Sequence, residues 1–504
     1  MQVRPIREED IEQVIQLFRL NYGDDYAIPE FYDPQWVRRG IYSDNIIWLV
    51  IEEEERVVAS GAAVLDFGDY NDQIAEIGRL VVDPAAGGRG LGRAMLYALV
   101  DASDDRVEFA FGEARTTHIK TQRIFDHVGL VPVGFLPMAY QMTWRESWVL
   151  SGQLFNNGRK LRQSATAQVI PEVEPIARLA LKNLELDEEV QVASNARPYA
   201  LDEVLEVEPL TGASLVRLLK IEQGRLVDPE VFGGLHLDQG ISQLRTRKAS
   251  YLVVKDGDEV LGAVGYLPDG RNLRIIELIA QDEDVKGCLL RKAIEVAEGE
   301  LKSEVIDCEV NAASPRIQRT LFEMGFLPAA YVPGMVFHNT ARWDVVKMMK
   351  LNIDWDLGPI ELTDSSRAMF DTVTPAFIRQ AEQSSRLREL DRVGIFQDMT
   401  PLEIDFVQRA CTEITPGAGS PLALGALWVV LAGQVSCADR SFTAGKCLGV
   451  AALLGGGGET SAHVSDGTRV LSLSPHEFQL LCNRYPRLGL KLYRNLIAYL
   501  LTNG

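Results

Sequence analysis

In the first 145 residues, segments whose apolar positions have the spacing of a helix alternate with segments typical of a β-strand. Ile11, Val14, Ile15 and Phe18 follow Asp10 at helical spacing. The other elements that the pattern predicts are strands at 3–6, 46–51, 57–65, 77–82, 107–113 and 131–142, and helices at 93–100 and 121–127. This order of strands and helices, with a hairpin near its start, predicts a mixed α/β (α+β) fold.

The strand at 77–82 leads into a loop rich in glycine. Asp83-Pro84 ends the strand, and the loop then contains Gly87, Gly88, Gly90 and Gly92. Backbone N–H groups that no side chain covers, at the positive end of a helix, form a site suited to phosphate. Two antiparallel strands precede the loop, which excludes a Rossmann site, and no Gly-Lys-Ser/Thr follows, which excludes a Walker loop. A plain turn between strand and helix is the alternative.

The succession of elements resembles the GNAT-type N-acetyltransferase superfamily. The matching motif is Val82-Asp83-Pro84 followed by Gly87-Gly88-Arg89-Gly90-Leu91-Gly92. The resemblance implies that acetyl-CoA or another acyl-CoA is the donor and an amine the acceptor. It also implies the donor site: backbone groups of Leu80, Val81 and Val82 at the thioester, and Gly87, Gly88, Arg89, Gly90, Leu91, Gly92 and Arg93 around the pyrophosphate. Gly87 departs from the family's Gln or Arg, which removes a side chain but no backbone donor.

Acyl transfer needs a base for the amine and an acid for the leaving thiolate. Glu76 and Glu113 are the candidate bases, and a solvated carboxylate at a strand end is the alternative for each. His118 is a candidate for contact with CoA or for proton transfer, with a polar helix cap as the alternative. Phe125 stands where the family often has a tyrosine acid. Tyr140 is a remote substitute, or the thiolate leaves unprotonated, since a thiol has a pKa near ~8.5.

Residues 21–36 lie where the family commonly lines its acceptor pocket. Their aromatic and acidic side chains would suit a cationic amine, and the candidates are Asp24, Asp25, Tyr26 and Tyr32. A packed surface loop is the alternative for each residue. The acidic run at 52–55 is expected to be a solvated hairpin turn.

A weak internal repeat extends the resemblance along the chain. Residues 121–132 match 317–328 at an offset of 196, and Glu113 falls on Glu309. The expected organisation is a GNAT-like domain at 1–145, an acidic connector at 146–209, a degenerate second GNAT-like domain at 210–350, a helical linker at 351–384 and a β-roll domain at 385–504. In the second unit only Gly287 matches a loop glycine, and three nearby acids would repel pyrophosphate. We therefore expect no donor site there; the unit either completes the acceptor pocket or only packs against the first.

Residues 385–504 resemble the cyclic-nucleotide-binding domain. The phosphate-binding positions read Gly449-Val450, Ala452-Leu453 and Thr460-Ser461, so the glutamate and arginine of that family are both replaced. Without the guanidinium a cyclic phosphate loses a charge-assisted contact. We therefore do not expect tight binding of cyclic AMP or GMP. We expect instead that this domain serves in dimerisation or as a rigid attachment.

Composition adds limits on the setting. The net charge of -20 argues against nonspecific nucleic-acid binding, and no apolar run reaches the ~18 residues of a membrane span. The N-terminal residues are charged and show no secretory signal, which predicts a cytoplasmic protein. The six cysteines form no Cys-x-x-Cys motif, which predicts that the protein binds no metal. The expected function is an N-acyltransferase that uses acyl-CoA. The alternatives are a non-catalytic acyl-CoA sensor or scaffold, and an acyltransferase with a long-chain acyl-CoA or acyl-carrier-protein donor.

Overall fold

The computed structural model describes residues 1–504 apart from 25, 27–28, 66–71, 143, 164–166, 202–204, 212–228, 233–248, 258, 391–392, 424, 438–439, 457–460 and 504. Two compact units are present: residues 1–200 with 205–377, and residues 378–504 with the described residue Leu201. Each is described by itself.

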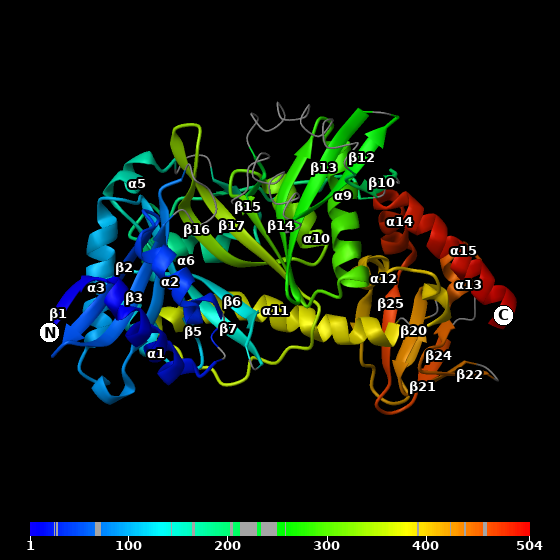
Figure 1. Ribbon diagram of the computed structural model, residues 1–504. Helices are drawn as coiled ribbons and strands as arrows, with labels where there is room; N and C mark the ends of the chain where they lie inside the picture. Colours follow the sequence, from blue (N-terminus) through cyan, green and yellow to red (C-terminus); the bar gives the residue numbers. More distant parts are fainter. Residues whose placement is uncertain are drawn as a thin grey trace. The chain divides into compact units, whose positions relative to one another are not determined.

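The first half of the larger unit is a mixed sheet with helices on both faces (Figure 1). Its strands are β1 (Gln2–Pro5), β2 (Ile46–Glu53), β3 (Arg56–Leu65), β4 (Ile74–Val82), β5 (Phe109–Arg115), β6 (Val131–Gln141) and β7 (Arg145–Leu154). Its helices are α1 (Ile11–Tyr22), α2 (Pro34–Ile41), α3 (Leu91–Asp104) and α4 (Lys120–Val128). The expected mixed α/β fold is confirmed. The region 131–142 is one strand, and its partner β7 begins at the expected domain boundary, so the first sheet extends to Leu154.

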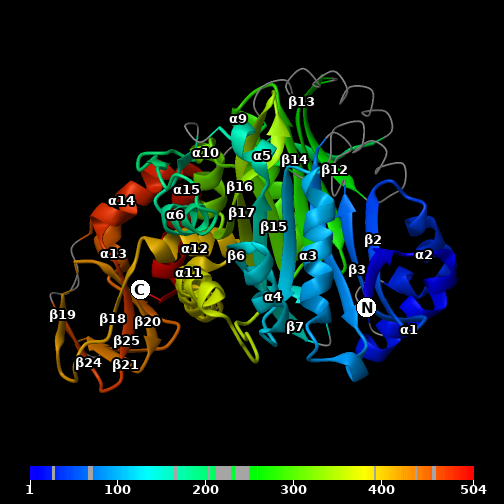
Figure 2. The ribbon, with the colours of Figure 1, turned by 90° about the vertical axis from the view of Figure 1, so that its left-hand side faces the viewer.

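Two apolar cores lie on the two faces of this sheet. Met95, Leu96 and Leu99 of α3 pack with Ala75 and Ile77 on one face. On the other face, Val14 and Phe18 of α1 pack with Trp48 and Val81. Figure 2 shows α3 lying across the sheet, with α1 and α2 beyond β2 and β3. The helix signal at Asp10 thus corresponds to α1, and Gly129, in the left-handed conformation, caps α4.

The second half of the larger unit repeats the strand order of the first. Its elements are β10 (Val207–Pro209), β11 (Val231–Phe232), β12 (Ser250–Asp256), β13 (Glu259–Asp269), β14 (Asn272–Ala280), α9 (Asp284–Glu295), β15 (Val305–Asn311), α10 (Pro315–Glu323), β16 (Leu327–His338) and β17 (Ala341–Leu351). The sheet order is β1-β2-β3-β4-β5-β7-β6-β16-β17-β15-β14-β13-β12-β10, with β11 beside β15. Counted outward from the centre, the first half reads β6-β7-β5-β4-β3-β2-β1 and the second reads β16-β17-β15-β14-β13-β12-β10. Strands in corresponding places in the two halves therefore follow the same order.

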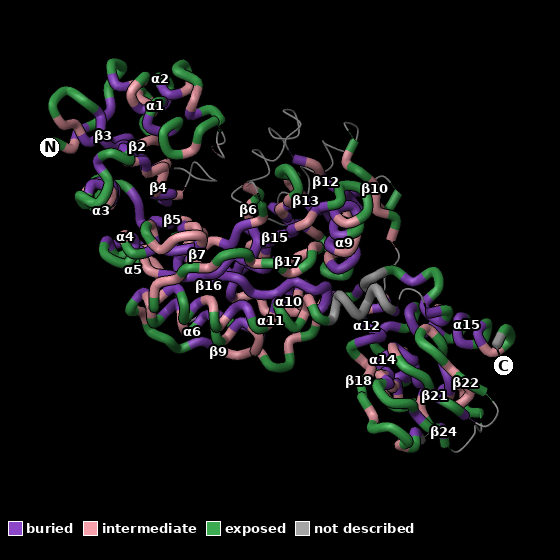
Figure 3. The backbone as a smooth tube through the Cα atoms, turned by 90° about the horizontal axis from the view of Figure 1, so that it is seen from below, coloured by how far each residue is buried: buried purple, intermediate pink, exposed green. Residues whose placement is uncertain are grey.

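The two halves meet where β6 pairs with β16. Gly134 lies opposite Ala330, and a Cβ atom on Gly134 would fall 2.3 Å from the Cβ of Ala330. Both β16 and β17 are buried along most of their length (Figure 3). Glycine at this position therefore allows the two strands to approach.

Residues 155–200, expected to be a solvated connector, also contribute to the core. After α5 (Asn156–Leu161) and the short parallel pair β8 (Gln168–Val169) and β9 (Gln191–Val192), α6 (Glu174–Asn183) packs on both β6 and β16. Ile176, Ala177, Ala180 and Leu181 are buried on its inner side. The acidic residues occupy the outer side, and so composition alone concealed this packing.

Buried ion pairs also join the halves. The Arg342 side chain is 0% exposed, and its Nη1 donates to Asp72 and Glu108, each at 2.8 Å. Arg162 makes a two-bond pair with Asp344, at 2.6 and 2.8 Å. Arg145 pairs with Glu304 at 2.7 Å. A buried ion pair that loses one partner is strongly destabilising, so these contacts fix the halves in one arrangement.

A long helix, α11 (Asp364–Leu390), leads into the smaller unit. That unit has two antiparallel four-stranded sheets, β18-β25-β20-β23 and β19-β24-β21-β22. The bounds are β18 (Thr412–Ile414), β19 (Pro421–Ala423), β20 (Leu427–Ala432), β21 (Gln434–Cys437), β22 (Arg440–Thr443), β23 (Cys447–Leu448), β24 (Ser461–Val464) and β25 (Arg469–Leu473), with helices α12 (Pro401–Arg409), α13 (Val450–Leu453), α14 (Pro475–Arg484) and α15 (Pro486–Asn503). None of the helices in the described part of the chain has the length and apolar content that crossing a bilayer requires.

Candidate active site

Strands β4 and β5 diverge, which opens the sheet beside the glycine loop. Their parallel ladder joins only residues 74–76 to 109–111, although β4 continues to Val82 and β5 to Arg115. On the β3 side, β4 carries an irregularity after Gly78, and Arg79 has a φ of +53°. Leu80, Val81 and Val82, the expected thioester-binding positions, lie in this diverging part. Val81 turns its side chain into the α1 core, while Leu80 and Val82 pack toward α3.

The glycine loop leads directly into α3. Gly88 and Gly90 both have a φ of +78°, and a Cβ atom on either would meet nothing within 4 Å. Gly90 is the N-cap of α3, so the first N–H groups of the helix, beginning at Leu91, follow an open backbone. Gly92 has a different role, because a Cβ there would lie 3.2 Å from Ile124. Glycine at 88 and 90 thus leaves room for an anion, whereas Gly92 lets α3 pack on α4.

Arg89 of this loop is paired with the hairpin turn. Its guanidinium donates two hydrogen bonds of 2.8 Å to the carboxylate of Glu53. The hydrogen bond from Arg89 lowers the pKa of Glu53. The acidic run that looked like a plain solvated turn therefore contributes a partner to the loop. Arg93 is exposed on the first turn of α3.

Glu76 lies on the face of the sheet that α1 covers. Its neighbours Ala75 and Ile77 belong to the α3 core, and side chains alternate along a strand. Arg79 Nη2 donates to Glu76 Oε2 at 2.7 Å. Burial raises the pKa of Glu76, and Arg79 offsets only part of this effect. Glu76 is thus a buried, paired carboxylate rather than a solvated strand end.

Glu113 projects from β5 on the same face as Glu76, since Ala110 and Ala114 belong to the α3 core. The hydroxyl of Tyr140 donates to Glu113 Oε2 at 2.5 Å. Burial raises the pKa of Glu113, Tyr140 lowers it in part, and the charge of Glu76 raises it further. Burial and Glu113 raise the pKa of Tyr140 well above its usual value. Tyr140 is therefore a donor that holds Glu113.

His118 and Phe125 flank the open end of β5. His118 Nδ1 is buried without a hydrogen-bond partner among the described residues. Burial, Arg115 and Lys120 lower the pKa of His118, so the ring is neutral at pH 7. The Phe125 ring is buried, and a Cβ atom on Gly112 would lie 2.6 Å from it. The position of the family tyrosine therefore belongs to the core.

Of the four expected acceptor residues, Tyr26 and Tyr32 are in contact, since the backbone N–H of Tyr26 donates to the Tyr32 hydroxyl at 3.2 Å. Tyr26 lies near Arg79 and Glu76, and its burial raises its pKa to about 12. Tyr32 holds the loop, donating to the carbonyl of Gly23 at 2.8 Å. Asp24 is 87% exposed and points away with Arg19, and Asp25 lies outside the described residues. Tyr26 alone of the described three reaches the face that carries the two glutamates.

Comparisons with known proteins agree with this geometry. The model of the acetyltransferase (GNAT) family matches residues 11–126, which confirms a GNAT acetyltransferase domain in this part of the chain. No curated protein matches the chain. Similar solved structures include ribosomal-protein-S5-alanine acetyltransferase from Vibrio fischeri (13% identity, TM-score 0.28, 31% of this chain and 93% of that one). Two others are ribosomal-protein-alanine N-acetyltransferase from Brucella melitensis (17%, 0.28, 31% and 100%) and a mutant spermidine N-acetyltransferase from Vibrio cholerae (14%, 0.27, 30% and 92%). The assignment rests on the family match.

Proposed function

We propose that the chain is an N-acyltransferase that moves an acetyl group, or another acyl group, from acyl-CoA to a primary amine. The observation that carries the proposal is the opening between β4 and β5 above the glycine loop, with the buried Glu76 and the half-buried Glu113 on one face. In this proposal Leu80 to Val82 bind the thioester arm, and the loop from Gly87 to Arg93 binds the pyrophosphate.

Glu113 is the proposed base. Its raised pKa suits a group that must accept a proton near neutral pH. The amine nitrogen attacks the thioester carbonyl, the new N–C bond forms, the C–S bond breaks, and the amine proton passes to Glu113. The thiolate leaves with the electron pair of the C–S bond, which a thiol pKa near ~8.5 allows. Glu76, held by Arg79, stabilises the incoming ammonium, and His118 contacts the CoA arm.

A charge placed at Gly90 tests the donor site. Gly90→Asp and Gly90→Asn have the same size, and both residue types tolerate a positive φ, so the pair differs by one negative charge. We expect Gly90→Asn to keep acetyl-CoA affinity within a few fold and Gly90→Asp to lose more than roughly tenfold in isothermal titration. Gly467→Asp, at another open glycine with a φ of +70°, is the control for strain. Equal affinity of the two Gly90 variants would refute the donor site.

Replacing the base separates an enzyme from a sensor. Glu113→Gln keeps an acceptor for the Tyr140 hydroxyl and should lower kcat by roughly 10²–10⁴-fold without weakening acetyl-CoA binding. Thioester consumption with a broad amine panel measures turnover. Binding of acetyl-CoA with no turnover of any amine would favour the sensor instead.

We also propose that the second half is a GNAT-type unit without a donor site. The ladder of β14 with β15 ends at Ile275 and Cys308, and β11 pairs with the next residues of β15, at Glu309 and Val310. Val231 and Phe232 are both buried there. The Glu230 carboxylate, just before β11, pairs with Lys286 in the first turn of α9 at 2.6 Å. The chain's own strand and carboxylate thus stand where a donor would need space.

Gly287 is not an open loop glycine in this half. It is buried inside α9, so a large charged residue there would disturb packing. Gly287, which the sequence aligns with a loop glycine of the first half, therefore offers no open backbone to a phosphate group.

For residues 385–504 we propose a cyclic-nucleotide-binding-like domain that no longer binds the nucleotide. Gly449 needs its positive φ and lack of Cβ, since a Cβ would lie 2.0 Å from the Ala426 carbonyl oxygen. Val450, at the position of the ribose-binding glutamate, is buried. Thr460 lies outside the described residues. We propose that this domain dimerises in the cytoplasm. Micromolar binding of cyclic AMP in isothermal titration would refute the proposed loss of nucleotide binding. A monomeric protein in analytical ultracentrifugation would refute dimerisation.

A further inference from the structure

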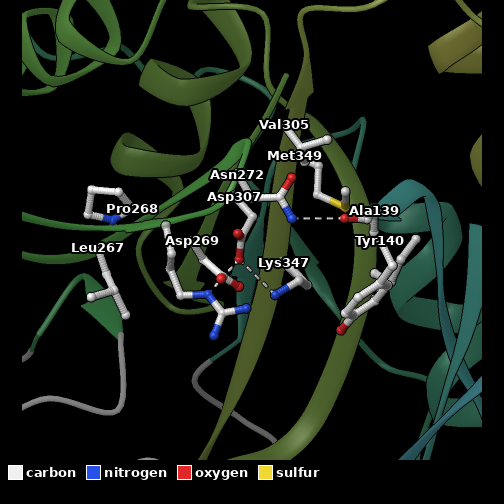
Figure 4. A pocket seen from close by; sticks show the side chains of 12 residues that line it. Ala139, Tyr140, Leu267, Pro268, Asp269, Asn272, Val305, Asp307, Lys347 and Met349 are labelled. Carbon is white, nitrogen blue, oxygen red and sulfur yellow. Dashed lines mark hydrogen bonds and ion pairs between the residues drawn. The ribbon is translucent and has the colours of Figure 1, made fainter. Parts of the chain in front are cut away.

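A cavity of about 540 Å³ lies where the two halves of the larger unit face each other. One wall comes from β6, with Leu136, Ala139 and Tyr140. The facing walls come from β13, β14, β15 and β17 of the second half, and contain Leu267, Pro268, Asp269, Asn272, Arg274, Val305, Asp307, Lys347 and Met349. A volume of this size holds a small organic molecule. Figure 4 shows these side chains around the cavity.

The polar side of the cavity has unused cationic donors. Arg274 Nε donates to Asp307 at 2.8 Å, while its two terminal nitrogens have no hydrogen-bond partner among the described residues. Its side chain is 39% exposed. Lys347 uses two of its three N–H groups, on Asp307 and Glu309, both at 2.9 Å. Asp307 and Glu309 are each paired with a cation, and so the free groups of these four side chains are donors; Asp269 also lines the cavity.

The cavity lies next to the residue that holds the proposed base. Tyr140 lines it and donates to Glu113. Lys347 lies between Asp307 and Tyr140 in the view of Figure 4. The charges of Lys347 and Arg274 both act on the pKa of Glu113. A molecule in the cavity therefore lies between Tyr140, which holds the base, and the guanidinium of Arg274.

We propose that Arg274 binds a carboxylate of the acceptor, and that the acceptor is an amine that also carries a carboxylate and an apolar portion. This inference rests on the proposed function and names its substrate class. The planar fork of two terminal N–H groups matches the two oxygens of a carboxylate. Leu136, Leu267, Val305 and Met349 surround the apolar portion.

The unused donors favour an anionic group over a cationic one at the Arg274 end of the cavity. A polyamine would place a second ammonium group beside the guanidinium of Arg274, and neither of these two groups can accept a hydrogen bond from the other. A phosphate dianion would bring a second negative charge beside Asp307 and Asp269. A single carboxylate adds one negative charge, and each of its two oxygens can accept from one terminal nitrogen of Arg274.

Matched acceptors test the proposal in the full chain. The probes are leucine, 3-methylbutylamine, which lacks only the carboxylate, and the phosphonate analogue of leucine. We expect leucine to exceed the other two in kcat/KM by roughly 10- to 100-fold. Arg274→Gln should remove that preference, measured as the ratio of kcat/KM for leucine to kcat/KM for 3-methylbutylamine in the same variant, because any change in the base affects both amines alike. Asp307 keeps Lys347 at 2.9 Å in this variant, so no carboxylate is left unpaired.

Arg271→Gln is the control, because Arg271 is on the same hairpin, is exposed and does not line the cavity. Isothermal titration of leucine gives a reading that needs no turnover: binding should weaken at least roughly tenfold in Arg274→Gln and not in Arg271→Gln. Equal use of leucine and 3-methylbutylamine, a preference for the phosphonate, or equal leucine binding in both variants would overturn the inference. Those results would leave the acyltransferase proposal standing. That proposal fails separately if Gly90→Asp binds acetyl-CoA as tightly as Gly90→Asn does.

Discussion

The contact between β6 and β16 gives a sharp prediction about how the larger unit is held together. In Gly134→Ala the new Cβ atom would lie 2.3 Å from the Cβ of Ala330 and 2.9 Å from the carbonyl oxygen of Ala329. Neither neighbour is the end of a flexible side chain, so the two strands must move apart. Overpacking of this kind costs about 1–3 kcal/mol of unfolding free energy.

Urea unfolding followed by tryptophan fluorescence measures this cost. Six of the seven tryptophans lie in the larger unit, and only Trp428 lies in the smaller one, so the signal reports mainly the larger unit. At a slope of about 3 kcal/mol per M, the midpoint should fall by roughly 0.3–1 M.

Gly299→Ala is the matched control, because a Cβ atom on Gly299 would meet nothing within 4 Å. Its free energy of unfolding should stay within about 0.5 kcal/mol of the parent. If both variants unfold at the same urea concentration, the close approach of β6 and β16 is not as described.

Three further predictions concern buried groups. Arg342→Met should destabilise the larger unit by about 3–5 kcal/mol in urea titration, because Asp72 and Glu108 lose their cation, whereas Arg39→Met on the exposed face of α2 should have little effect. The folded-state pKa of Glu113 is raised above 4.5, so its contribution to the free energy of unfolding is present below about pH 4.5 and is lost as the pH rises through the folded-state pKa. The Glu113→Gln variant should therefore gain stability relative to the parent as the pH rises over that range. A difference in stability that does not change with pH would contradict this. Iodoacetamide followed by peptide mass spectrometry should label Cys482 well before Cys308, because Cys308 is fully buried and burial raises its pKa well above 9; faster labelling of Cys308 would show that β15 opens.

The sequence predicted the local elements well, because their signals are local. Apolar runs marked β2 and β3, and the helical spacing after Asp10 marked α1. The glycine loop and the two glutamates were also visible, since each follows or lies within a readable strand.

The contacts between distant segments could not be predicted in the same way. Arg342 and Asp72 are 270 residues apart, and no period connects them. Arg274 and Lys347 read as ordinary strand residues until the fold places them around one cavity with Tyr140. The acidic run hid the pairing of Glu53 with Arg89, because composition shows charge but not partners.

The pairing of Arg342 with Glu108 also has a consequence for synthesis on the ribosome. The arginine emerges 234 residues after the glutamate. At about 5–20 residues per second, this delay lasts roughly 10 to 50 s. During that time Asp72 and Glu108 have no arginine partner from β17, and the edge of β6 has no β16 to pair with. The nascent first half is therefore expected to depend on chaperones for longer than a single-domain acetyltransferase would, until the second half arrives to complete the sheet.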